Sequence, residues 1–156
     1  MSEANGGPAA TGEARTAPLI LLVDDFQDNR EMYAEYFGYF DFRVVEAANG
    51  IEALEKAFDE TPDVVIMDLS LPGMDGWEAT RRLKNDPRTK KVPVIALTGH
   101  ALAGHSKGAR DAGCDAFVAK PCLPEKLLEE VRRLLAASAA SGKSRPASRR
   151  GAEPRR

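Results

Sequence analysis

The sequence predicts an α/β domain in which helices cover both faces of an open sheet of five parallel strands. Its short apolar runs are mostly continuous rather than alternating, which is typical of strands covered on both faces. Each run is followed by a segment able to form a helix, the alternation that builds parallel sheets. Residues 19–135 of the 156-residue chain carry this pattern and are enough for one core. We therefore expect one domain.

Five apolar runs are the predicted strands. They are LILLV (19–23), FRVVEA (42–47), DVVIM (63–67), VPVIAL (92–97) and AFVA (116–119). Right-handed crossover connections make all five strands parallel. Their carboxyl ends are therefore expected to share one edge of the sheet.

The first two helices are predicted over 27–40 and 49–60. The stripe that should face the core in the first consists of Met32, Tyr33, Tyr36, Phe37 and Phe40, and in the second of Ile51, Leu54, Ala57 and Phe58. Both stripes have the three- and four-residue spacing of a helix. Asn49 is a suitable N-cap for the second helix, which should end before Pro62 because the residue preceding proline resists helical geometry.

Three further helices are predicted over 75–85, 101–111 and 124–135. Gly104 and Gly108 should make the second of these the loosest helix of the fold. The last begins at Pro124, and its apolar positions are Leu127, Leu128, Val131, Leu134 and Leu135.

Composition and charge narrow the function classes. Residues 19–135 carry a net charge of −6, which does not favour nucleic-acid binding, whereas 136–156 carry +5. Segments 1–18 and 136–156 lack an apolar period, so both are predicted to be disordered tails. Cys114 and Cys122 match neither a redox pair nor a zinc ligand set. With no secretory leader or membrane-length apolar run, we expect a cytoplasmic protein.

Polar side chains follow four of the five predicted strands. Asp24 and Asp25 follow the first strand, Asp68 the third, Thr98 the fourth and Lys120 the fifth. In open α/β sheets the functional crevice lies outside the carboxyl ends of the strands. These five groups, distant in sequence, are therefore expected to converge.

The chemistry of this set favours magnesium and phosphate. Three carboxylates without arginine partners form a hard oxygen site that suits Mg²⁺. Thr98 can donate a hydrogen bond and Lys120 supplies a compact positive charge for phosphate. With the metal screening repulsion, one carboxylate can attack phosphorus and form an acyl phosphate.

On these residues the chain resembles the receiver domains of two-component response regulators. The resemblance rests on VDDFQDNR, VVIMDLSLPGMDGWEATRRLK, VPVIALTGHA and AGCDAFVAKPC, and it extends over 19–135. It implies a doubly wound, flavodoxin-like fold with strand order 2-1-3-4-5. It also implies that Asp68 accepts a phosphoryl group from a histidine kinase or phosphotransfer protein.

The resemblance also assigns the surrounding residues. It implies that Asp25 and Asp68 bind Mg²⁺ directly with the backbone carbonyl of Ser70, and that Asp24 acts mainly through water. Lys120 would pair with Asp68 and the phosphoryl group, and its bond to Pro121 is expected to be cis.

Switching residues follow from the same resemblance. Thr98 would bond the phosphoryl oxygen, and Phe117 would follow it as the switch aromatic. The surface of the fourth helix, fifth strand and fifth helix would then change shape. Ser70 and His100 occupy positions that tune the lifetime of the phosphoryl group.

We therefore expect a single-domain response regulator, monomeric or weakly dimeric, that catalyses only its own phosphorylation and dephosphorylation and acts on a downstream protein or in a phosphorelay. A Mg²⁺-dependent phosphohydrolase with an aspartyl nucleophile stays an alternative, although VDDFQ lacks the Asp-x-Asp spacing of the haloacid dehalogenase type. Two further alternatives are a flavodoxin-like cofactor carrier and a receiver cut from a larger hybrid kinase.

Overall fold

The structure is a computed structural model that describes residues 17–71, 73–99 and 111–140. In chain order the elements are β1 (Leu19–Val23), α1 (Gln27–Tyr39), β2 (Arg43–Ala47), α2 (Gly50–Glu60), β3 (Val64–Asp68), α3 (Gly76–Lys84), β4 (Val94–Thr98), β5 (Ala116–Ala119) and α5 (Pro124–Ala140). Every predicted strand is present within two residues of its expected bounds.

The five strands form one parallel sheet in the order β2-β1-β3-β4-β5, as predicted. The register between neighbouring strands brings their carboxyl ends level, because Asp68 of β3 pairs with Leu97 of β4 and Thr98 of β4 pairs with Ala119 of β5. The polar groups at the ends of β3, β4 and β5 therefore lie along one edge.

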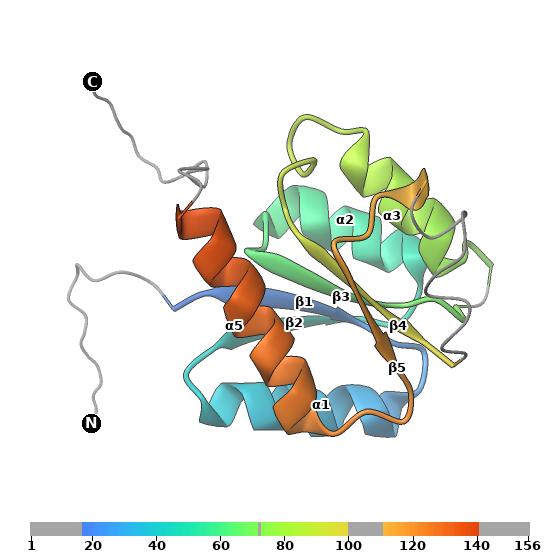
Figure 1. Cartoon of the computed structure of the whole chain (residues 1–156). Coiled ribbons are helices and arrows are strands. Elements are labelled where there is room, and N and C mark those ends of the chain that lie inside the picture. The colour runs from blue at the N-terminus through green and yellow to red at the C-terminus, as the bar shows by residue number, and fades with distance from the viewer. Residues whose placement is uncertain (1–16, 72, 100–110, 141–156) are drawn as a thin grey trace, which may run out of the picture.

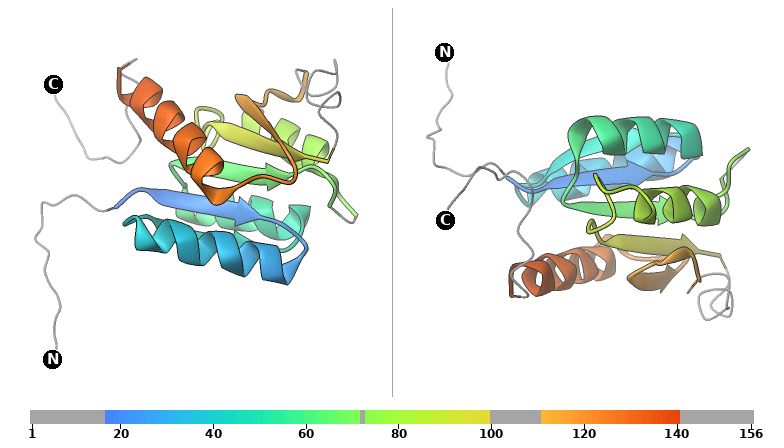
Figure 2. Two further views of the ribbon diagram at one scale, coloured as in Figure 1. Left: turned by 60° about the horizontal axis from the view of Figure 1, so that its bottom comes forward. Right: turned by 90° about the horizontal axis from the view of Figure 1, so that it is seen from above.

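Helices cover both faces of this sheet (Figures 1 and 2). Helices α1 and α5 pack on one face, where Phe37 and Leu127 join Ile66 in one apolar cluster. Helices α2 and α3 pack on the other, where Leu54 and Leu83 join the second cluster. Strands β1, β3 and β4 are buried throughout, which explains their uninterrupted apolar sequences.

Local signals in the sequence set the helix ends. The Asn49 side chain accepts a hydrogen bond from the Glu52 amide at 2.8 Å, and Asp75 caps α3 by accepting from the Glu78 amide at 2.9 Å. Asp41, just after α1, has a φ of 72°, a left-handed conformation that Asp tolerates moderately well.

Two details differ from the sequence prediction. Met32 and Ile51 were assigned to the core but are 42% and 59% exposed, because each stripe is wider than the surface its helix buries. Helix α5 continues to Ala140, five residues beyond its predicted end at 135, through alanines that favour helix. The predicted helix over 101–111 lies almost wholly outside the described residues, as do 1–16 and 141–156 of the predicted tails. Among the described helices, none is long and apolar enough to cross a membrane.

Asp115 joins three elements at the end of the sheet opposite the polar edge. Its Oδ2 atom accepts hydrogen bonds from the Val94 amide and from Lys84 Nζ, both at 2.8 Å. Lys84 Nζ also donates to the Val92 carbonyl at 2.8 Å. One carboxylate thus holds α3 and the starts of β4 and β5 together.

Replacing this carboxylate tests its contribution to stability. Asp115→Ala leaves the Val94 amide and the Lys84 ammonium without this acceptor, so the free energy of unfolding should fall by about 1–3 kcal/mol. Urea denaturation measures the change. Asp59→Ala, at an exposed position on α2, is the control and should change stability by about 0.5 kcal/mol or less. Equal effects of the two substitutions would contradict the assignment.

Candidate functional site

Three carboxylates meet at the carboxyl edge of the sheet. Asp24 and Asp25 follow β1, and Asp68 is the last residue of β3. One carboxylate oxygen from each lies within 4.8 Å of the others. Two of the three acids, Asp24 and Asp68, are buried, whereas Asp25 is exposed. The convergence predicted from sheet topology is confirmed.

The Asp24 carboxylate is buried and only partly paired. Its side chain is 1% exposed, and Oδ1 accepts a hydrogen bond from the Phe26 amide at 2.9 Å. Oδ2 has no hydrogen-bond partner among the described residues. Burial raises the pKa of this carboxyl, and the nearby charges of Asp68 and Asp25 raise it further, against lowering by the Phe26 amide and Lys120. The unpaired oxygen is therefore suited to a cation.

Asp68 is held on both of its oxygens. Oδ1 accepts a hydrogen bond from the Ser70 amide at 2.9 Å, and Oδ2 accepts one from Lys120 Nζ, also at 2.9 Å. This ion pair joins residues 52 positions apart, and the carboxylate is only 2% exposed. The Lys120 side chain is 29% exposed, so the lysine is the more accessible partner of the pair.

Gly76 allows α3 to begin directly against the backbone of Asp68. A Cβ atom at this position would lie 2.5 Å from the Asp68 carbonyl oxygen and 2.7 Å from the Leu69 Cα. Real side chains do not approach backbone that closely, so only glycine fits here. The start of α3 thus fixes the end of β3 from outside the sheet.

Backbone contacts place Thr98 and Lys120 beside Asp68. The Lys120 amide donates to the Thr98 carbonyl at 2.7 Å, and Thr98 is 4% exposed. The Lys120–Pro121 bond is cis, as the resemblance implied. Phe117 is half-buried on β5, paired in register with Ala96. Ser70 is exposed next to the acids, and His100 lies outside the described residues.

Two α1 residues that support the site were not identified from the sequence. Arg30 Nη1 donates to the Asp24 carbonyl at 2.8 Å, and its Nε pairs with Glu46 at 3.0 Å. The Tyr33 hydroxyl donates at 2.8 Å to the carbonyl of Cys122, two residues beyond Lys120. Tyr33 was assigned to packing because its spacing fits the apolar stripe, and spacing gives no information on a hydroxyl partner.

These groups form a set with oxygen ligands on one side and an ammonium on the other. The three carboxylates and Lys120 sum to −2 when all are ionised. Oxygen ligands with an excess of negative charge match the preference of Mg²⁺. The residues present therefore fit a small divalent cation next to a phosphoryl-binding lysine.

Comparisons with known proteins agree on one family. The model of the response regulator receiver domain matches residues 20–132. The polar-differentiation response regulator DivK of Brucella anthropi is 31% identical over 116 residues, which cover 74% of this chain and 94% of that protein.

Solved structures give the same result. The chemotaxis protein CheY4 of Vibrio cholerae superposes with a TM-score of 0.72 at 30% identity, covering 76% of this chain and 98% of that one. The receiver domain of sensor histidine kinase PA1611 from Pseudomonas aeruginosa superposes with a TM-score of 0.71 at 32% identity, covering 77% of this chain and 98% of that one. That structure has a magnesium ion coordinated in the active site cleft.

The raised pKa of Asp24 predicts how stability depends on pH. Because the folded chain holds the Asp24 proton more tightly than the unfolded chain, whose pKa is near 3.8, the free energy of unfolding falls as pH rises above that value. Asp24→Asn removes this loss. In chelator, the variant should gain stability over the natural protein as pH rises from below 3.8 to 7.

Urea denaturation over a pH series measures this difference. Glu35→Gln, at an exposed position on α1, is the control, and its stability difference should stay nearly constant with pH. A stability difference between Asp24→Asn and the natural protein that stays constant over the pH series would contradict the assignment.

Proposed function

The chain belongs to the family of response regulator receiver domains, and we propose that Asp68 is its phosphoryl acceptor. Members of the family are signalling domains that interact with histidine kinases or phosphotransfer proteins. The observation that carries the proposal is the Asp68 carboxylate, buried to 2% exposure between the Lys120 ammonium and two further acids. A purely structural acid would not need this arrangement.

The proposed reaction is a displacement at phosphorus. An Asp68 carboxylate oxygen attacks the phosphorus of a phosphohistidine, or of a small acyl phosphate, and forms a new P–O bond. The bond from phosphorus to the donor breaks, and the leaving group keeps its electron pair. Lys120, already 2.9 Å from Asp68 Oδ2, is placed to stabilise the negative oxygens of the transferred group.

We further propose that Mg²⁺ occupies the acidic cluster. Asp25, Asp68 and the carbonyl of Ser70 would hold it, with Asp24 acting through water. When bound, the ion supplies positive charge that screens the carboxylates and the phosphoryl oxygens from one another. Support comes from the unpaired Asp24 Oδ2 and from the magnesium in the similar PA1611 receiver.

The proposed signal is a change of surface driven by a few polar contacts. Phosphorylation places a phosphoryl group with a charge of about −1.5 to −2 on Asp68 in place of the −1 of its carboxylate, with oxygens that Thr98 and Lys120 can bond. Each charge-assisted bond contributes roughly 1.5–3 kcal/mol, and about 5.5 kcal/mol moves a population from 1:99 to 99:1. Thr98 would move inward and Phe117 would follow. The changed surface of the fourth predicted helix, β5 and α5 would bind a downstream protein or pass the phosphoryl group on.

Ser70 and His100 are proposed to set the lifetime of the phosphoryl group. Ser70 is exposed two positions beyond Asp68, where a side chain can influence the approach of water.

The same chemistry fits a receiver within a larger histidine kinase. The likeness to the PA1611 receiver favours this as the second candidate function.

Substitution of Asp68 tests the acceptor. Asp68→Asn removes the nucleophilic oxygen while keeping the size of the side chain, so labelling by radioactive acetyl phosphate with Mg²⁺ should be abolished. Asp28→Asn, an exposed acid on α1, should label like the natural protein. Undiminished labelling of the Asp68 variant would refute the assignment.

Addition of Mg²⁺ tests the metal site without any reaction. A ligand at 100 times its dissociation constant stabilises the folded state by about 2.7 kcal/mol, so the melting temperature should rise with Mg²⁺. The rise should shrink in Asp25→Asn and persist in Asp28→Asn, and scanning calorimetry measures it. Equal shifts in all three proteins would place the ion elsewhere.

A further inference from the structure

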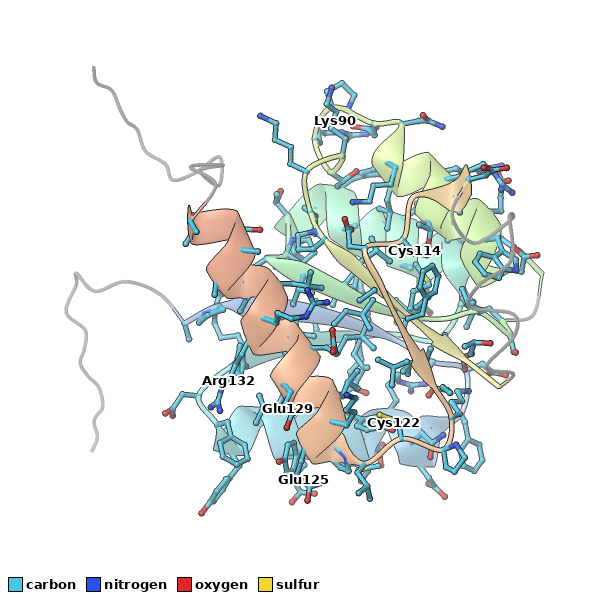
Figure 3. All side chains as sticks on the ribbon, in the orientation of Figure 1. Lys90, Cys114, Cys122, Glu125, Glu129 and Arg132 are labelled. Atoms are coloured by element: carbon cyan, nitrogen blue, oxygen red, sulfur yellow. The ribbon has the colours of Figure 1, made fainter. Side chains whose placement is uncertain are left out.

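The loop between β5 and α5, residues 120–123, has an anchor on each side of its bend. At its start, the Lys120 amide donates to the Thr98 carbonyl of β4 at 2.7 Å. Two residues later, the Cys122 carbonyl accepts the Tyr33 hydroxyl of α1 at 2.8 Å. Figure 3 shows Cys122 in this loop, at the foot of α5 near α1. The loop that carries Lys120 is therefore tied to both a strand and a helix.

Tyr33 is itself firmly placed. Its side chain is 5% exposed and belongs to the apolar cluster that contains Leu127 and Leu128 of α5. Its ring stacks on Phe37, with the centroids 6.5 Å apart. Burial, with the neighbouring Cys122 and Asp24, raises the pKa of Tyr33 to about 12. The hydroxyl therefore keeps its proton at neutral pH and stays a donor.

Lys120 depends on the position of this loop. Its ammonium meets Asp68 Oδ2 at 2.9 Å, and its side chain is still 29% exposed. A flexible four-carbon side chain gains freedom when it leaves such a pair, so the pair persists only if the backbone brings the ammonium within reach. Small displacements of a catalytic group reduce rates steeply.

We propose that Tyr33 is a positioning residue for Lys120, acting through the Cys122 carbonyl. The inference rests on the proposed acceptor role of Asp68. Helix α1 then supports both sides of the site, because Arg30 holds the Asp24 carbonyl and Tyr33, three residues on, holds the loop that carries Lys120. The ring packs in the core, and the hydroxyl acts on the site.

A double-mutant cycle tests the proposal. Tyr33→Phe keeps the ring and removes the hydroxyl, and it should lower the maximal rate of acetyl phosphate labelling by about tenfold, with little change in the donor concentration at half-maximal rate. In the Lys120→Met background the same substitution should have no further effect. Equal losses in both backgrounds would show a general structural role and overturn the proposal.

A neighbouring tyrosine gives the matched control. Tyr36 also lies on α1 and packs its ring against Phe37 and Phe40, but its hydroxyl has no hydrogen bond to any described residue. Tyr36→Phe should therefore label at the natural rate. A loss equal to that of Tyr33→Phe would show that the effect comes from α1 packing and not from the Tyr33 hydroxyl.

A second measurement needs no phosphorylation. The NMR order parameter of the Lys120 side chain, in protein with labelled lysine, should fall in Tyr33→Phe toward the values of exposed lysines and stay unchanged in Tyr36→Phe. An unchanged order parameter in Tyr33→Phe would overturn the proposal. Failure of the natural protein to label would count against the acceptor role of Asp68, and the order parameter would then decide on Tyr33 by itself.

Discussion

The ion pair between Lys120 and Asp68 is the contact on which the rest of the site depends. A carboxylate that is 2% exposed is costly to ionise without a partner, and its ammonium comes from 52 positions away. The two residues meet only because β3 and β5 flank β4 in one parallel sheet with aligned ends. The chemical site is thus a product of the sheet topology, and it forms when that half of the sheet is assembled.

The acidic residues at this carboxyl edge of the sheet destabilise the fold. Asp24 lies buried with one oxygen unpartnered among the described residues, and the charges around it raise its pKa. One lysine leaves an excess of negative charge among three acids. The apolar clusters on both faces of the sheet are what hold these like charges together. A divalent cation would neutralise this excess charge, and a phosphoryl group on Asp68 would restore part of it, so the charge at this edge of the sheet depends on both.

Sequence patterns predicted the strands better than the surfaces of the helices. Continuous apolar runs mark buried parallel strands, and the acids after them were located by topology alone. Met32 and Ile51 were wrongly assigned to the core, because periodicity identifies the side of a helix but not how far its neighbours extend around it. The bond from Tyr33 to Cys122 could not be predicted, since it joins residues 89 positions apart and depends on a carbonyl that any residue carries.

Tyr33 shows why core and site are one structure here. A tyrosine can bury its ring while its hydroxyl bonds a distant carbonyl, so a position in an apolar stripe can also fix a loop. The opposite end of that loop is held by the Thr98 carbonyl, and Thr98 is also the residue proposed to move toward the phosphoryl group. A movement of Thr98 would therefore act on the backbone of Lys120 directly, while Tyr33 keeps the far side of the loop in place. Asp68, Lys120 and Thr98 are in this way linked by two direct contacts rather than by a long series: the 2.9 Å ion pair between Lys120 and Asp68, and the 2.7 Å hydrogen bond from the Lys120 amide to the Thr98 carbonyl.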